Sequence, residues 1–171
     1  VLILSGCENN DTSSQVSATG EKGRLNNSVD WATYRGDQEG SHYSSLKQIT
    51  TENVQLLEEV WTYDVGNVVR PGTSSNPIII AGVMYFADAE LNLIALNAAT
   101  GEELWVFDPS ENHRRGNKLA NGIMRGEVHW EDEDGNNARI FHTTKDLIWA
   151  VNPDDGSLIE SFGEGGHIDL K

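Results

Sequence analysis

One stretch of sequence decides the fold class of this chain: Ala95-Leu96-Asn97-Ala98-Ala99-Thr100-Gly101-Glu102-Glu103-Leu104-Trp105. It predicts a hairpin in which two apolar strands flank a turn. Gly101 can take the positive φ that the turn needs, and the side chain of Asn97 can bond the turn backbone. Trp105 offers a large flat face for packing between sheets. An isolated hairpin that contains a tryptophan by chance is the alternative, and the neighbouring sequence distinguishes the two.

The sequence on both sides repeats this pattern. Upstream, 77–80 and 83–86 predict two strands around the tight turn Ala81-Gly82. Downstream, the alanine, asparagine and glycine of the motif recur 55 positions later, as Ala150, Asn152 and Gly156. The second copy consists of two apolar segments, a turn and a last segment: 139–144, 147–152, 153–156 and 157–162.

A four-stranded unit that recurs in series is typical of a β-propeller, in which each blade buries its faces against its neighbours. Helical periodicity is scarce, and only Thr51 to Glu59 predicts a short helix or turn. We therefore expect an all-β chain that forms a partial β-propeller of about two to three blades. Two copies and a lead strand cannot close a ring.

The composition excludes several classes of function. The 171 residues contain 12 Lys and Arg against 27 Asp and Glu, a formal charge of −15. A nucleic-acid partner is therefore not expected, because phosphate binding needs a basic face. The single cysteine, Cys7, excludes a disulfide within the chain and a metal site built from several cysteines.

The first residues predict a lipoprotein. Residues 1–7 end in Leu4-Ser5-Gly6-Cys7, the pattern of a bacterial lipoprotein processing site in a truncated signal, with Cys7 as the lipidated residue. A chance cysteine after an apolar segment is the alternative. Residues 8–28 are rich in Asn, Ser, Thr and Gly and predict a flexible tether, and 29–171 form the folded blades. No segment approaches the length of a membrane-spanning helix, so a lipid is the only expected membrane anchor.

The docking motif, in which Ala95, Asn97, Thr100, Gly101 and Trp105 are the key residues, resembles the tryptophan-docking repeat of quinoprotein dehydrogenases. These enzymes use pyrroloquinoline quinone (PQQ) in an eight-bladed propeller. The second copy departs from the motif, since Glu160 stands where the docking tryptophan is expected. The opening block resembles the start of the membrane-associated glucose and alcohol members: Trp31-Ala32-Thr33-Tyr34-Arg35-Gly36-Asp37, His42-Tyr43-Ser44-Ser45-Leu46 and Val60-Trp61-Thr62-Tyr63.

The resemblance covers about 30–170 and corresponds to the first quarter or so of a whole enzyme. It implies a PQQ-dependent dehydrogenase in which Ca²⁺ polarises the quinone and an aspartate or histidine base acts on the CH–OH group of a sugar or alcohol. It further implies that electrons pass to ubiquinone or a cytochrome. Because of the lipoprotein pattern that ends in Cys7, we expect the protein to be a lipoprotein anchored in the bacterial periplasm. The family's base and calcium ligands lie beyond Lys171, so we expect the 171 residues alone to be inactive.

Two residues are candidate cofactor ligands by the same resemblance. Arg125 stands at the family arginine that contacts PQQ, and a guanidinium suits its carboxylates and carbonyls. An ion pair of Arg125 with an acidic neighbour, Glu127, Glu131 or Asp132, is the alternative. Ser74 stands where many members have Glu or Gln, and ordinary loop polarity is the alternative for this serine.

Three departures leave the substrate open. Leu119-Ala120 replaces the cysteine pair of methanol-type members, Asn121 replaces the histidine of glucose-type members, and Glu127 replaces an apolar residue. The five histidines show no metal-ligand spacing, and each is predicted to be solvated or structurally bonded. Residues 131–135 fit a hairpin turn better than a calcium loop. A second function remains open: a non-enzymatic propeller lipoprotein of the outer-membrane assembly type, because one architecture hosts both.

Overall fold

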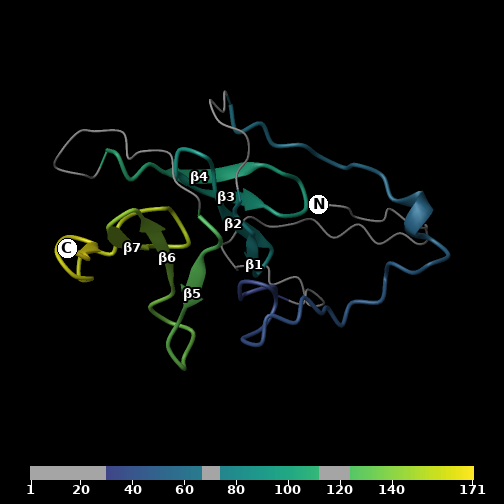
Figure 1. Ribbon diagram of the computed structural model, residues 1–171, viewed down its shortest axis with the longest axis horizontal. Helices are drawn as coiled ribbons and strands as arrows, with labels where there is room; N and C mark the ends of the chain where they lie inside the picture. The colour runs from purple at the N-terminus through teal and green to yellow at the C-terminus, as the bar shows by residue number, and fades with distance from the viewer. Residues whose placement is uncertain (1–29, 67–73, 112–123) are drawn as a thin grey trace, which may run out of the picture.

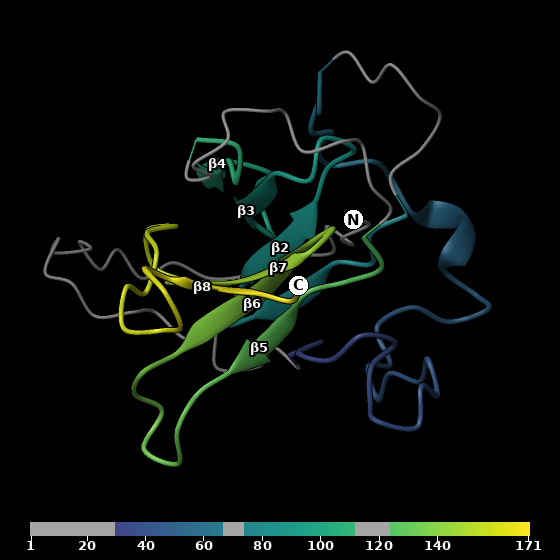
Figure 2. The ribbon, with the colours of Figure 1, turned by 60° about the vertical axis from the view of Figure 1, so that its left-hand side comes forward.

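The computed structural model describes residues 30–66, 74–111 and 124–171. They form two four-stranded antiparallel sheets, each with its strands in sequence order. The two sheets lie next to each other, the first in teal and the second in green to yellow (Figures 1 and 2). The strands are β1 (Ile78–Ile80), β2 (Val83–Ala87), β3 (Leu93–Asn97), β4 (Glu103–Phe107), β5 (Val128–Trp130), β6 (Arg139–Thr144), β7 (Leu147–Val151) and β8 (His167–Asp169).

The hydrophobic core lies between the two sheets, because side chains from both contribute to one cluster. Phe107 of β4 packs edge-on against Trp149 of β7, with ring centroids 5.6 Å apart. The buried members of the cluster are Ile78, Tyr85, Leu93, Ala95, Phe107, Ile140, Leu147, Trp149 and Val151. Each sheet therefore buries a face only against its neighbour, as blades of a propeller do. The predicted all-β, partial-propeller architecture is confirmed.

The docking motif has the predicted local structure. Gly101 has φ +74°, and the side-chain oxygen of Asn97 accepts hydrogen bonds from the N–H groups of Ala99 (2.9 Å) and Thr100 (3.2 Å). Ala95 is fully buried. The indole of Trp105 lies over the turn of the next blade, since a Cβ added to Gly156 would meet its ring at 2.7 Å. Trp105 thus packs between blades, as predicted.

The end of the second copy differs from the prediction. Residues 157–162 pair with β7 only briefly, through a bridge between Leu158 and Val151 and the bond from Ile159 N–H to the carbonyl of Ala150 (2.9 Å). The chain then turns at glycines 163, 165 and 166, which all have positive φ. It returns to β7 as β8, which is therefore the fourth strand of the second blade.

Only one helical segment occurs in the described residues, the 3₁₀ turn Val54–Leu56 inside the predicted 51–59 segment. It stands away from both sheets at one side of the molecule (Figure 1). None of the described helices is long and apolar enough to cross a membrane.

Candidate functional site

The two candidate cofactor ligands lie at the same end of β1 and β5, where the two blades meet. The backbone N–H of Asn76 donates to the carbonyl of Arg125 (3.0 Å), and its side-chain amide donates to the same oxygen (3.2 Å). Asn76 and Gly126 form a parallel bridge between the segments that lead into the two strands. Ser74 precedes Asn76 by two residues, and both Ser74 and Arg125 are exposed. The fold therefore presents a hydroxyl and a guanidinium at one end of adjacent strands.

The acidic neighbours do not pair with Arg125 in the described part of the chain. The carboxylate of Glu127 faces His142 instead, with both oxygens 3.2 Å from Nδ1. Glu131 follows the far end of β5, and the carboxylate of Asp132 accepts bonds from the backbone N–H of Asn136 and the side chain of Asn137. The guanidinium of Arg125 thus stays available to an anionic ligand.

A close contact of Gly126 keeps Arg125 at this position. A Cβ on Gly126 would lie 2.9 Å from Cδ2 of Tyr34 and 3.3 Å from the carbonyl oxygen of Asn76. Only glycine lets the chain approach both groups. Tyr34 belongs to the opening block, so that block contributes packing to this site. Sequence reasoning assigned Tyr34 no role, although the resemblance of its segment was a signal.

Two buried residues close to Arg125 in the fold were not predicted to contact each other. Glu127 and His142 are 1% and 0% exposed, and Nε2 of His142 lies 2.9 Å from the carbonyl oxygen of Leu91 in the first blade. A charged side chain is rarely buried unless it is paired. The sequence did carry a signal, because Glu127 departs from the apolar residue expected there. His142 was predicted to be a solvated or structurally bonded histidine, and it is structurally bonded.

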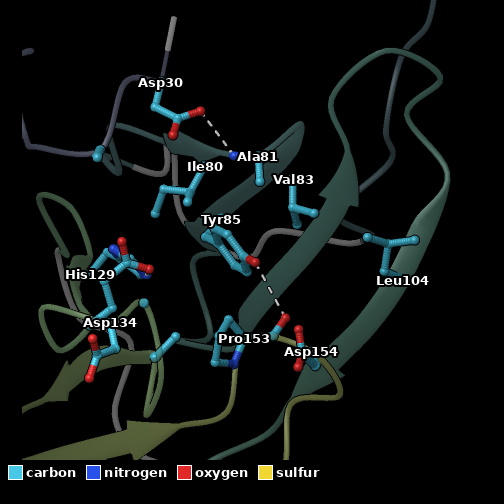
Figure 3. Close-up of a pocket in the computed structure, with 14 residues that line it drawn as sticks. Asp30, Ile80, Ala81, Val83, Tyr85, Leu104, His129, Asp134, Pro153 and Asp154 are labelled. Atoms are coloured by element: carbon cyan, nitrogen blue, oxygen red, sulfur yellow. Dashed lines mark hydrogen bonds and ion pairs between the residues drawn. The ribbon is translucent and has the colours of Figure 1, made fainter. Parts of the chain in front are cut away.

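A cavity of about 670 Å³ opens between the blades at the other end of the strands (Figure 3). Its wall includes the β1–β2 turn at Ala81, the end of β5 at His129, and the turn at Pro153. Burial lowers the pKa of His129, and the nearby carboxylates of Glu131 and Asp30 partly oppose this effect. Because Arg125 precedes β5 and His129 lies within it, the cavity is separate from the candidate ligands.

The described residues include no group of three or more His, Cys, Asp or Glu side chains that could hold a metal ion. Residues 131–135 form the predicted turn, in which Gly135 N–H donates to the carbonyl of Asp132 (2.9 Å). Cys7, Leu119-Ala120 and Asn121 lie outside the described residues, as do the predicted segments 1–7 and 8–28.

The donor set fits PQQ, which carries carboxylates and quinone oxygens. An exposed guanidinium with fixed backbone and a neighbouring hydroxyl can bind such oxygens in a charge-assisted way. Together, the blades and this end of the strands define a β-propeller protein with an exposed arginine at the junction of two blades.

The chain belongs to the PQQ family described as glucose/ethanol/alcohol dehydrogenase, beta-propeller domain, whose profile matches residues 31–171. This match confirms the predicted family, and PQQ is the cofactor of that family.

Individual relatives agree with the family. The quinoprotein glucose dehydrogenase of Escherichia coli K12 is 40% identical over 78 residues, which are 42% of this chain and 10% of that protein. The 1-butanol dehydrogenase (cytochrome c) of Thauera butanivorans is 36% identical over 72 residues, 42% of this chain and 10% of that protein. The matched part of the chain thus spans about a tenth of the length of these curated relatives.

Solved structures show the same fold. The quinohemoprotein alcohol dehydrogenase of Comamonas testosteroni has a TM-score of 0.65 at 23% identity, covering 82% of this chain and 19% of that one. A europium-containing methanol dehydrogenase has a TM-score of 0.57 at 19% identity, covering 83% of this chain and 23% of that one.

Proposed function

We propose that this chain forms the first blades of a PQQ-dependent dehydrogenase that oxidises the CH–OH group of a sugar or an alcohol. Arg125 binds carboxylate or carbonyl oxygens of the cofactor, and Ser74 adds a hydrogen bond from the neighbouring strand. The observation that carries the proposal is the bridge between Asn76 and Gly126, which brings Ser74 and Arg125 to the same end of two adjacent strands.

When bound, PQQ supplies a two-electron acceptor for the hydride that leaves the carbinol carbon. The residues of this chain orient and charge-balance the cofactor. The planar guanidinium fork of Arg125 can hold two oxygens at once. Its carbonyl is fixed by the two N–H donors of Asn76, so less freedom of the backbone is lost on binding.

The test uses the full-length protein, reconstituted with PQQ and Ca²⁺, in a dye-reduction assay with a panel of sugars and primary alcohols. We expect reduction that depends on both additions. Failure of the full-length protein to bind PQQ or to reduce dye with any substrate would overturn the proposal and favour the non-enzymatic scaffold. The 171 residues alone should be inactive, because the resemblance places the family's base and calcium ligands beyond Lys171.

Substitution of Arg125 separates charge from geometry. R125A should weaken PQQ binding about 10- to 100-fold, as expected for a lost charge-assisted hydrogen bond of about 1.5–3 kcal/mol. R125K keeps the charge but loses the planar fork, so its loss should be smaller than that of R125A. The dissociation constant is measured by titrating the apoprotein with PQQ. An unchanged constant in R125A would remove Arg125 from the cofactor site.

We also propose that electrons leave through ubiquinone or a cytochrome. The name of the Thauera butanivorans relative includes cytochrome c, which supports a cytochrome for that protein. Comparison of ubiquinone analogues with cytochrome c as oxidants of the reduced full-length enzyme distinguishes the two. Failure of both would overturn this part of the proposal.

Membrane attachment through a lipid on Cys7, on the periplasmic side of a bacterial membrane, is a separate proposal that rests on the Leu4-Ser5-Gly6-Cys7 pattern. Mass spectrometry of the protein purified from membranes should find a diacylglyceryl group on Cys7. C7S should move the protein to the soluble fraction. An unmodified Cys7 in membrane-derived protein would contradict lipidation.

A further inference from the structure

A buried pair of ionisable side chains begins two residues after the proposed cofactor ligand. Glu127 follows Arg125 by two residues, and continuation of the β5–β6 register places Glu127 opposite His142. Both side chains have 0% exposure, and Nδ1 of His142 is 3.2 Å from each carboxylate oxygen of Glu127. The cofactor contacts proposed above do not use either side chain.

His142 has hydrogen-bond acceptors on both sides of its ring. Nδ1 faces Glu127, and Nε2 lies 2.9 Å from the carbonyl oxygen of Leu91. Both ring nitrogens therefore have an oxygen partner within hydrogen-bond distance, one on each blade. The ring is further held edge-on by Phe107 of the first blade, with centroids 6.3 Å apart. His142 therefore links Glu127, which follows Arg125 in the chain, to the carbonyl of Leu91 and the ring of Phe107 in the first blade.

The acceptor in the first blade is itself fixed. Leu91 lies in the 88–92 turn with φ +66° and is 3% exposed. The carboxylate of Asp88 holds this turn by accepting bonds from the N–H groups of Glu90 and Asn92 (both 2.8 Å) and from the side chain of Asn92 (2.8 Å). Polar contacts thus link the 88–92 turn through His142 to Glu127, and we call this chain of contacts the polar strut.

The first blade has no such strut at the corresponding place. Continuation of the β1–β2 register places Asn76 opposite Ala87, which is fully buried. A small apolar side chain therefore suffices there for packing. Burial of an ion pair costs desolvation free energy that apolar side chains avoid, so a pair is weak evidence for stability. Among the described residues, this buried carboxylate–imidazole pair occurs only in the blade that carries Arg125.

We propose that Glu127 and His142 are positioning residues for Arg125. Asn76 holds the carbonyl of Arg125 on one side, and Glu127 is fixed on the other side through His142 to Leu91. The backbone of residues 125–127 is therefore held at both ends before the cofactor arrives, which lowers the entropic cost of binding. This role rests on the proposed function, because it requires that Arg125 contacts PQQ.

The test compares PQQ binding by the full-length apoprotein in two backgrounds. H142L and E127V should each raise the dissociation constant for PQQ about tenfold when Arg125 is present, and less than twofold in R125A, since a lost positioning effect needs the arginine that it positions. H129Q is the matched control, because His129 lies on β5 in the separate cavity, and it should change binding less than twofold.

A second measurement needs no cofactor. Hydrogen exchange of the apoprotein, read by mass spectrometry, should become faster in the peptide that covers 124–128 when either partner is replaced, and should stay unchanged around β3. The double variant E127V/H142L addresses folding, because an apolar pair can restore stability. We expect its melting temperature to approach that of the unaltered protein, while exchange at 124–128 and the loss of PQQ affinity remain.

The outcomes separate the two proposals. Lack of PQQ binding by the unaltered protein would overturn the proposed function. Normal binding by the unaltered protein, together with equal losses in the Arg125 and R125A backgrounds, would overturn the positioning role alone. So would full recovery of affinity in the stable double variant, or unchanged exchange at 124–128 in the single variants.

Discussion

The two docking turns of the molecule have the same shape but different partners. The indole of Trp61 lies over Gly101 in the first blade, and the indole of Trp105 lies over Gly156 in the second; an added Cβ would meet the rings at 2.6 and 2.7 Å. Nε1 of Trp105 donates to the carbonyl of Pro153 (3.1 Å), whereas Nε1 of Trp61 is buried with no partner in the described residues. Stacking on glycine is therefore the shared feature, and the indole hydrogen bond is an addition specific to the second turn.

The largest expected effect comes from removing an indole. W105A should lower the free energy of unfolding by about 3 kcal/mol, because a large contact between blades is lost. E160A is the matched control, since Glu160 occupies the corresponding position of the second copy and is exposed. It should change stability by less than about 0.5 kcal/mol. Chemical denaturation of the full-length protein measures both, and equal effects would contradict a docking role for Trp105.

A smaller loss of stability is expected when Gly101 or Gly156 is replaced by alanine. G101A and G156A should each cost about 2 kcal/mol, through strain at positive φ and through contact with the indole. G135A separates the two causes, because Gly135 has φ +72° but nothing within 4 Å of its added Cβ. Its cost should be about 1 kcal/mol, from the backbone alone. A loss in G135A equal to that in G156A would mean that the indole contact has no cost.

The difference between the turns predicts a still smaller, asymmetric effect. W105F and W61F remove similar volumes, but only W105F removes a hydrogen bond. W105F should therefore be less stable than W61F by about 1 kcal/mol, the usual net value of one hydrogen bond. The two variants are compared by denaturation of the full-length protein. A greater loss in W61F would show that its indole N–H has a partner outside the described residues.

The smallest effect concerns the cavity beside the second turn, which His129 and Pro153 both line. Burial lowers the pKa of His129 from 6.5, so the unfolded chain binds this proton more strongly than the folded protein. The contribution to stability is therefore present above about pH 6.5 and is lost as the pH falls. When the pH falls from about 7.5 to 5.5, the free energy of unfolding should decrease less in H129Q than in the unaltered protein. Parallel losses in both proteins would contradict a perturbed His129.

Much of the fold could be predicted because residues within each repeat determine its turns and strands locally. Gly101 and Asn97 specify the turn, and alternating apolar runs specify β1 to β4, β6 and β7. The end of the second blade could not be predicted in this way. Residues 157–162 continue the repeat in sequence, but three glycines then turn the chain and β8 becomes the fourth strand. That choice depends on which segment pairs with β7, a tertiary contact that periodicity does not encode.

The candidate site was only partly predictable. Resemblance pointed to Arg125 and Ser74, and the structure shows them at one end of adjacent strands. The role of Asn76 could not be predicted, because its two bonds to the carbonyl of Arg125 join residues 49 positions apart. His142 was equally hidden, since its acceptor on Leu91 is a backbone oxygen 51 positions away. Every residue type has a backbone carbonyl, so the sequence does not reveal which residue supplies such an acceptor.

The arrangement of the docking contacts has an evolutionary consequence. Each indole is supplied by the segment before the blade whose glycine it covers, so a contact belongs to a pair of neighbours and to neither copy alone. Gene duplication of one unit therefore creates a new junction that already contains both halves. Glu160 stands at the position of Trp105 in the second copy, so the two junctions before it keep their indole contacts whatever residue stands there.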